Sequence, residues 1–395
     1  MSYQFRERLT EGNNASLGVF AAVVALVLLP FVLGGFQTFL LAETLIFVLF
    51  ATSFNLLYGF TGLLSFGHAM FIAAGGYTTA KVVSWLAPTL GFASSGGIDP
   101  IVSWTIALVL GFIASGALAA LIGYFAVKLE EIYFALITLA FSMAIYVVLL
   151  QDLIGELLFV LGLGDGSWSN ESDGLAFSLN EVSVAGLEFR FMSIVDPFAY
   201  YFFVLLIVLI GMYALYRVVQ SPFGMICRAI RENPERAEAL GVNVTTHRWT
   251  TFVISGAFSG LAGVMLVTLE TGVNPEAHAF WVASADPVVM TIIGGPYSFL
   301  GPAVGAFVFE YGRWFITQFP ALEAHWEFWF GLIILTFVLF FDNGVAGGIN
   351  RFRAWLALAQ SRYEEEGVSG VVALTSETIS KYKAKAGKRI GGLTN

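Results

Sequence analysis

Residues 101–127 read IVSWTIALVLGFIASGALAALIGYFAV, a stretch without a single charged side chain. A helix of roughly 20 apolar residues is long enough to cross the hydrocarbon core of a bilayer. Its backbone polar groups are all bonded within the helix, which is what a segment surrounded by lipid requires. The stretch therefore predicts a membrane-spanning helix.

The composition of the whole chain agrees with this prediction. Of its 395 residues, 57% are hydrophobic and only 12% are charged, whereas soluble domains carry about 25% charged residues. Lipid must therefore be the main solvent of the folded chain. The net charge of −9 argues against nucleic-acid binding, which needs a basic face. Cys227 is the single cysteine, so the chain has no internal disulfide and no cysteine metal site.

Hydropathy predicts an all-α integral membrane protein with about ten transmembrane helices. The eighth span is short and rich in glycine, so we expect it to be broken or re-entrant. The polar start of the chain and the length of the apolar run after it argue against a cleavable signal peptide. The predicted spans are 16–34, 38–58, 62–86, 101–127, 132–154, 197–218, 249–270, 281–295, 300–319 and 326–346.

Basic residues predict the orientation, because cytoplasmic segments carry an excess of lysine and arginine. With the N-terminus inside, all but three of the 19 basic residues fall in cytoplasmic segments or, in the case of Arg217, at the cytoplasmic end of a span. Arg190 then lies outside, and Lys81 and Arg313 lie within spans. We therefore expect a multi-pass protein of the plasma membrane with both termini in the cytoplasm. The expected parts are an N-terminal arm (1–15), a transmembrane domain (16–348) and a tail (349–395).

One long insertion, at 155–196, is predicted on the outer side. It is acidic and contains GDGSWSNESDG, a run of turn-forming residues, followed by LAFSLNEVSVAGLEF, in which polar and apolar residues alternate. This alternation predicts a small β-hairpin. The segment is either a solvated loop or a docking surface for an external partner.

A second insertion, at 220–248, is predicted in the cytoplasm and contains the sequence NPERAEALG. Asn233 suits an N-cap, Pro234 the first helical position and Gly241 the C-terminal cap. A short helix is therefore predicted at Pro234–Leu240. Such a charged helix either lies on the membrane surface or is bound by a soluble partner.

This insertion resembles the cytoplasmic coupling loop of branched-chain amino acid ABC-transporter permeases, which docks on an ATP-hydrolysing subunit. The matching sequences are SPFG, RAIREN and RAEALG, within residues 221–241. The resemblance assigns an ATPase-coupling role to Ser221, Pro222, Phe223, Gly224, Arg228, Arg231, Glu232, Asn233, Glu235, Arg236, Glu238 and Gly241.

Two glycine-rich stretches resemble the same family. They are NLLYGFTGLLSFGHAMFIAAGGYTTA (55–80) and GGPYSFLGPAVGAFVFEYGRW (294–314). His68 is either a packing residue or part of a pathway, and Glu310 either pairs with Arg313 at i, i+3 or serves gating. The candidate pathway residues are Asn55, Gly59, Gly62, Ser65, Gly67, His68, Gly294, Gly295, Gly301 and Glu310.

The sequence offers no catalytic constellation. It contains no nucleotide-binding P-loop and no metal-binding histidine pair, so we expect no catalytic residues, no cofactor and no metal. The resemblance implies four partners: two ATP-binding cassette subunits, a second homologous permease and an extracytoplasmic solute-binding protein. Urea or short amides are alternative solutes. An ion-coupled secondary transporter using Glu310 and Asp286, and a membrane-embedded enzyme, are further alternatives.

Overall fold

The computed structural model describes residues 18–92, 97–162, 167–179, 181–184, 187–191 and 197–320, with a few isolated positions beyond. The predicted N-terminal arm lies outside the described residues, and so does almost all of the predicted tenth span and the tail. In the described chain, six helices are long and apolar enough to cross a membrane. They are Gly35–Thr61, Asp99–Ala126, Ile132–Leu150, Phe198–Gln220, Val244–Glu270 and the segmented Pro275–Gly294. A helical, multi-pass membrane protein is thus confirmed, but the count of ten spans is not.

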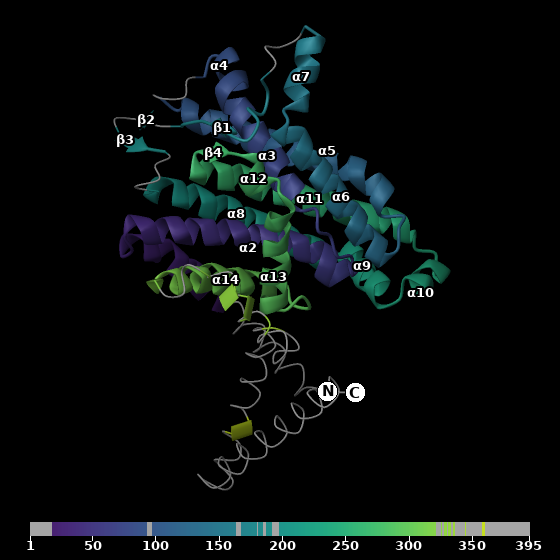
Figure 1. The fold of residues 1–395 in the computed structure, drawn as a ribbon. Helices are drawn as coiled ribbons and strands as arrows, with labels where there is room; N and C mark the ends of the chain where they lie inside the picture. Colours follow the sequence, from purple (N-terminus) through teal and green to yellow (C-terminus); the bar gives the residue numbers. More distant parts are fainter. Residues whose placement is uncertain are drawn as a thin grey trace.

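The described helices form one bundle around α2 (Figure 1). In the most apolar stretch of α2, 94% of the residues are buried, whereas in the most apolar stretch of α6 only 28% are buried. Helix α11 packs on α2, α3 and α5, while α8, α13 and α14 pack on other sides of α2. The main helices are α2 (Gly35–Thr61), α3 (Ala69–Lys81), α5 (Asp99–Ala126), α6 (Glu131–Leu150), α8 (Phe198–Gln220), α11 (Val244–Glu270), α13 (Ala285–Gly294) and α14 (Gly301–Thr317).

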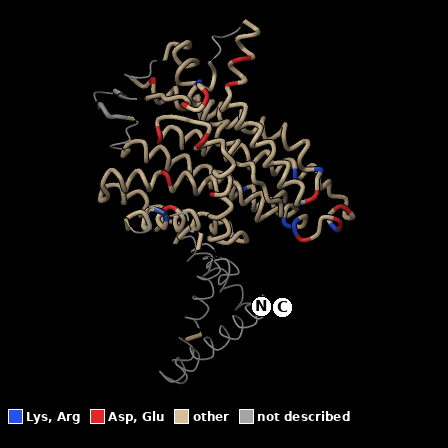
Figure 2. Tube along the Cα trace, viewed as in Figure 1, with Lys and Arg blue, Asp and Glu red and all other residues tan. Residues whose placement is uncertain are grey.

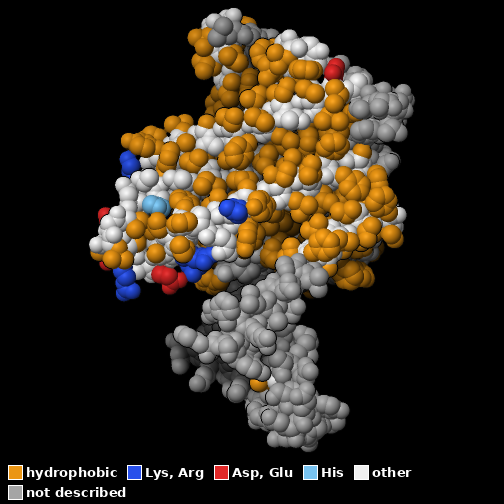
Figure 3. Space-filling view, turned by 180° about the vertical axis from the view of Figure 1, so that it is seen from behind, with side chains coloured by type: hydrophobic (Ala, Val, Ile, Leu, Met, Phe, Trp, Pro, Cys, Tyr) orange, Lys and Arg blue, Asp and Glu red, His pale blue; other side chains and the backbone are white. Residues whose placement is uncertain are grey.

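The outward faces of the peripheral helices are apolar. Ile113 and Leu121 on α5, Leu136 on α6 and Ile210 on α8 are all exposed. Figure 3 shows hydrophobic side chains over most of the visible face. A water-facing surface would not present so many large apolar side chains in continuous patches. These faces are therefore suited to lipid.

Two predicted spans are broken. The span predicted at 62–86 begins with non-helical residues, because Gly62 ends α2 in the left-handed conformation (φ +85°). Only then does α3 start, and it continues through a π-helical turn, η2 (Val82–Leu86), into α4 (Ala87–Thr89). The predicted eighth span is part of a chain of short segments: α12 (Pro275–His278), η3 (Trp281–Ser284) and α13.

The end of the bundle that carries the 155–196 insertion holds the strands. The predicted span 132–154 stops earlier, at Leu150, where α6 ends. Helix α7 (Leu153–Val160) follows. Strand β1 (Leu175–Ala176) pairs with β4 (Gly272–Val273), and β2 (Glu181–Val184) pairs with β3 (Leu187–Arg190) in antiparallel register. The predicted β-hairpin is therefore present.

The opposite end of the bundle holds α9 (Pro222–Glu232) and α10 (Pro234–Ala239). Helix α9 packs against α2, α8 and α11, whereas α10 packs mainly on α9. Figure 2 shows basic and acidic residues gathered around these two helices, while long stretches of the bundle carry none. The predicted short helix at 234–240 is confirmed, one residue shorter at its end.

Candidate coupling site and polar cavity

Helix α9 is held against the bundle by its own sequence. Ser221 is the N-cap, with its hydroxyl accepting from the Gly224 backbone N–H at 3.5 Å, and Pro222 occupies the first turn. Gly224 lies so close to the end of α8 that a Cβ there would overlap the Val219 carbonyl. Phe223 stacks on His247 of α11, with ring centroids 5.5 Å apart. One face of α9 is therefore buried.

Two arginines of α9 reach the end of α2. The guanidinium of Arg228 lies over the Phe60 ring, 5.3 Å from its centroid. The guanidinium of Arg231 donates to the Gly59 carbonyl and lies 4.8 Å from the Tyr297 ring centroid. Arg231 also pairs with Glu232 at 2.8 Å. A cation at a helix C-terminus stabilises the unpaired carbonyls there, so Arg231 joins α9 to both α2 and the α13–α14 turn.

Helix α10 presents its side chains to solvent. Its N-cap, Asn233, accepts from the Arg236 N–H at 2.7 Å, and Gly241 follows the helix with φ +89°. Leu240 at the tip is 80% exposed. The exposed polar and charged side chains around it include Glu232, Asn233, Glu235, Arg236 and Glu238.

Beside α10 the surface is hollowed. An open depression of about 510 Å³ is lined by Glu238 and by the residues from Gly241 to Thr246. Its floor is the start of α11, whose N-cap Asn243 accepts from the Thr246 N–H at 2.9 Å. A protruding tip next to a depression is a shape that a protein partner could grip.

The glycines of the 294–301 segment allow α13 and α14 to meet. A Cβ at Gly294 would overlap the Gly301 carbonyl, and one at Gly301 would overlap the Gly295 carbonyl. Asn55 of α2 is buried and donates to the Ser298 carbonyl at 3.3 Å, which fixes this turn against α2. The α13–α14 turn therefore lies against the same end of α2 that Arg231 contacts.

The neighbouring 62–68 segment is built around His68. Its Nδ1 lies 3.1 Å from the Ser65 hydroxyl and its Nε2 lies 2.9 Å from the Ser255 hydroxyl of α11. Ser65 also accepts from the Gly67 N–H at 3.3 Å. Both ring nitrogens of His68 have partners and the side chain is fully buried. This arrangement fits a packing role for His68.

Glu310 does not lie with the other candidate pathway residues. It is nine residues beyond Gly301 on α14, about 14 Å along the axis of a helix. It forms the predicted ion pair with Arg313, at 3.0 Å. Arg313 also pairs with Glu43 of α2, at 3.1 Å. Glu43 precedes Gly59 by 16 residues, about 24 Å of helix. The structure thus separates the predicted candidates into two places.

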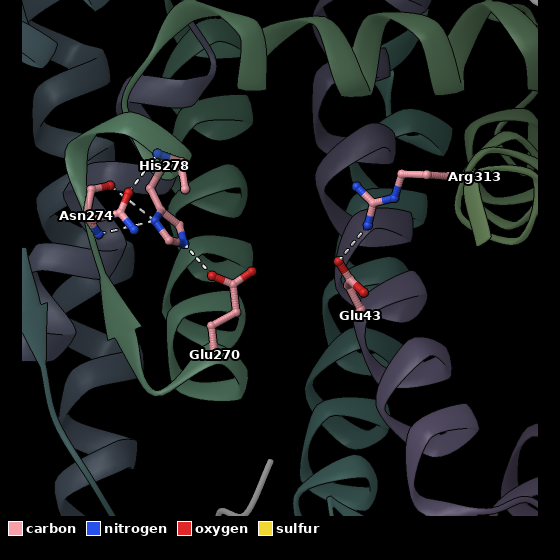
Figure 4. A network of polar contacts seen from close by, with 6 residues as sticks. Glu43, Glu270, Asn274, His278 and Arg313 are labelled. Atoms are coloured by element: carbon pink, nitrogen blue, oxygen red, sulfur yellow. Dashed lines mark hydrogen bonds and ion pairs between the residues drawn. The ribbon is translucent and has the colours of Figure 1, made fainter. Parts of the chain in front are cut away.

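A cavity of about 200 Å³ lies beside Arg313 and Glu43. Figure 4 shows the Arg313–Glu43 pair and the His278–Glu270 pair on different helices. Both pairs line the cavity, as does Asp286. His278 contacts Glu270 at 2.9 Å through Nε2, and its Nδ1 accepts from the Asn274 N–H at 3.3 Å.

Most of these residues were missed by sequence reasoning. Glu43 is a lone acid inside the predicted span 38–58, and an ionisable residue within a span is itself a signal of function. Glu270 and His278 lie at or beyond predicted span ends, where a charge is ordinary. Only the fold brings them to the same cavity as Arg313.

Known proteins have sequences similar to that of this chain. A family model described as a branched-chain amino acid transport system / permease component matches residues 36–341. The chain belongs to this permease family. The match includes α9, α10 and every residue of the cavity, so both sites lie within the family's own domain.

Individual relatives of this permease are distant. The high-affinity branched-chain amino acid transport system permease protein LivM of Salmonella typhimurium is 27% identical over 297 residues, covering 71% of this chain and 63% of that protein. LivM of Escherichia coli is 25% identical over 317 residues, covering 76% of this chain and 68% of LivM. The probable LivH of Methanocaldococcus jannaschii is 26% identical over 281 residues, covering 69% and 78%. No solved structure is significantly similar to this chain.

Proposed function

We propose that this permease is the membrane subunit of an ATP-driven importer of branched-chain amino acids, and that a separate ATPase drives it through α9 and α10. Both termini then lie in the cytoplasm. The further partners are a second ATPase subunit, a homologous permease and an extracytoplasmic solute-binding protein. The relatives named above are branched-chain amino acid transport permeases, which supports the proposal.

Helices α9 and α10 differ in how far they are buried, and this difference is the main support for the proposal. Helix α9 buries Gly224, Cys227 and Ile230 in the bundle. By contrast, Leu240 at the end of α10 is exposed, and so are the charged side chains around it. A partner that holds α10 would therefore move α9 with it. Because Arg231 reaches the Gly59 carbonyl, that motion reaches the end of α2.

The second step is the transfer of motion to the translocation path. Tyr297, under the guanidinium of Arg231, belongs to the turn between α13 and α14. A displacement of α9 would shift this turn against α2, where Asn55 holds it. Rigid-body movement of packed units is a common form of conformational switching.

Leu240→Asp tests the docking step. Leu240 is 80% exposed, so a charge there should leave folding intact but disrupt a partner's apolar contact. We expect affinity-purified variant protein to recover at least tenfold less ATPase than the wild type. Leu161→Asp is the matched control, because Leu161 is also exposed, at 60%, at the other end of the molecule. Equal ATPase recovery with Leu240→Asp would contradict the proposal.

A further inference from the structure

We propose that the cavity between α2, α11, α12, α13 and α14 is a binding site for the zwitterion of an α-amino acid. This inference rests on the proposed transport function and adds to it the site within the permease where the solute binds. The cavity is about 200 Å³, below the ~300–1,000 Å³ of pockets for drug-sized ligands. It is therefore a site for a small solute.

The lining changes from charged to apolar along the helix axes. On α2, Glu43 is followed by Phe47 and Phe50, which also line the cavity. On α11, Glu270 is preceded by Leu266, another lining residue. These steps correspond to roughly one or two helical turns, about 5–10 Å. A solute with a charged head and an aliphatic side chain matches this gradient, with the aliphatic end deeper in the bundle.

The carboxylates of the cavity favour an ammonium group. Among the residues that the structure describes, Glu270 forms an ion pair with His278 alone. Asp286 forms no ion pair and no hydrogen bond in the described part of the chain. Glu43, the third carboxylate of the lining, pairs with Arg313. The lining thus holds three carboxylates for one arginine, and an excess of carboxylate over cation at a partly buried site is costly unless a positive charge joins it.

Arg313 is placed to receive the solute's carboxylate. Both of its ion pairs, with Glu43 and Glu310, are made by Nη2. Its Nη1 and Nε have no protein partner among the described residues, and the side chain is 34% exposed. A guanidinium offers several donors in a planar fork that matches a carboxylate. One face of Arg313 is thus available to a ligand.

Other occupants fit less well. A bare metal cation would meet the charge of Arg313, and no group of three His, Cys, Asp or Glu side chains in the described chain is arranged to hold a metal. A neutral solute such as urea would bring no counter-charge to Asp286. The combination of acids, one arginine and aromatic walls fits a zwitterion.

The test measures binding of radiolabelled L-leucine to the purified full chain in lipid nanodiscs, by scintillation proximity. Asp286→Asn should weaken leucine binding about tenfold or more, since a hydrogen bond between charged groups is lost. Arg313→Lys keeps the charge that Glu310 needs but removes the fork. It should abolish the preference for L-leucine over leucinamide, which lacks the carboxylate. Glu156→Gln is the control, because Glu156 is an exposed acid on α7.

Competition with analogues identifies the recognised groups. Leucinamide and 4-methylpentanoate, which lacks the ammonium, should each compete with L-leucine at least tenfold less well, and urea not at all. Leucine binding unchanged by both Asp286→Asn and Arg313→Lys would overturn the site. Loss of binding in Asp286→Asn, together with no ATP-driven uptake by the wild-type importer, would instead support the site and overturn the proposed function.

Discussion

At the scale of single residues, Arg231 is the link between the exposed helix and the bundle. We predict that Arg231→Ala lowers ATP-driven uptake about tenfold or more, since hydrogen bonds to charged groups contribute ~1.5–3 kcal/mol. The same variant should still insert in the membrane and recover the ATPase, because α10 is untouched. Arg217→Ala is the matched control: Arg217 is also near a helix end but contacts only Tyr213 of its own helix among the described residues. Wild-type uptake by Arg231→Ala would contradict this role.

Asp152 anchors the segment after α6 to the bundle. Its carboxylate accepts from the backbone N–H groups of Gly155 at 3.2 Å, Trp168 at 2.7 Å and Ser169 at 2.9 Å. Burial acts to raise the pKa of Asp152, but these hydrogen bonds outweigh it and the pKa is lowered. The ionised form therefore stabilises the folded state at neutral pH, and this contribution is lost as the pH falls through the folded-state pKa.

Asp152→Asn should consequently lower the free energy of unfolding by about 1–3 kcal/mol at pH 7. The difference from the wild type should shrink as the pH falls below the pKa of about 3.9 expected for an unfolded chain. Thermal unfolding in detergent at several pH values measures it, with Glu156→Gln as the control. A difference in unfolding free energy between the two proteins that grows as the pH falls would contradict this prediction.

Residue-level prediction from the sequence worked best where chemistry is local. Asn233 as an N-cap and Gly241 after the helix are confirmed, because capping depends only on neighbouring backbone. The Glu310–Arg313 pair is also confirmed, because residues three positions apart are neighbours on the surface of a helix. The second partner of Arg313, Glu43, lies 270 residues away. No spacing rule reaches so far, so the cavity could not be predicted.

At the scale of elements, the α13–α14 pair depends on glycine at its closest approach. Gly301→Ala would place a methyl group against the Gly295 carbonyl, and overpacking typically costs ~1–3 kcal/mol. We predict a lower thermal unfolding temperature for Gly301→Ala in detergent. Gly34→Ala is the control, since a Cβ at Gly34 has no atom within 4 Å. An unchanged unfolding temperature for Gly301→Ala would mean that the two helices are not held this closely.

The sequence predicted helices better than it predicted their breaks. Hydropathy found the regions of α2, α5, α6, α8 and α11, because length and apolarity define a span. It extended the third span over the non-helical residues 62–68, because Leu63, Leu64 and Phe66 are as apolar as a helix would be. What makes this break possible is tertiary: His68 and Ser65 find partners on each other and on α11.

At the scale of the whole molecule, the permease has two sites at different depths. Arg231 contacts one end of α2, and the cavity around Arg313 lies toward the other. Helix α2 is common to both and is the most buried of the six spans in the described part of the chain. A movement imposed on α9 would therefore be passed through α2 and α14 to the walls of the cavity. This geometry suits an importer in which one end receives force and the other receives solute.

The most direct measurement is L-leucine uptake into proteoliposomes that contain the importer purified from its native membrane, with all ion gradients dissipated. We predict accumulation that requires hydrolysable ATP on the side of the membrane that α10 faces and that disappears with Leu240→Asp. Accumulation of leucine by the permease alone, without an ATPase and driven by an ion gradient, would contradict it.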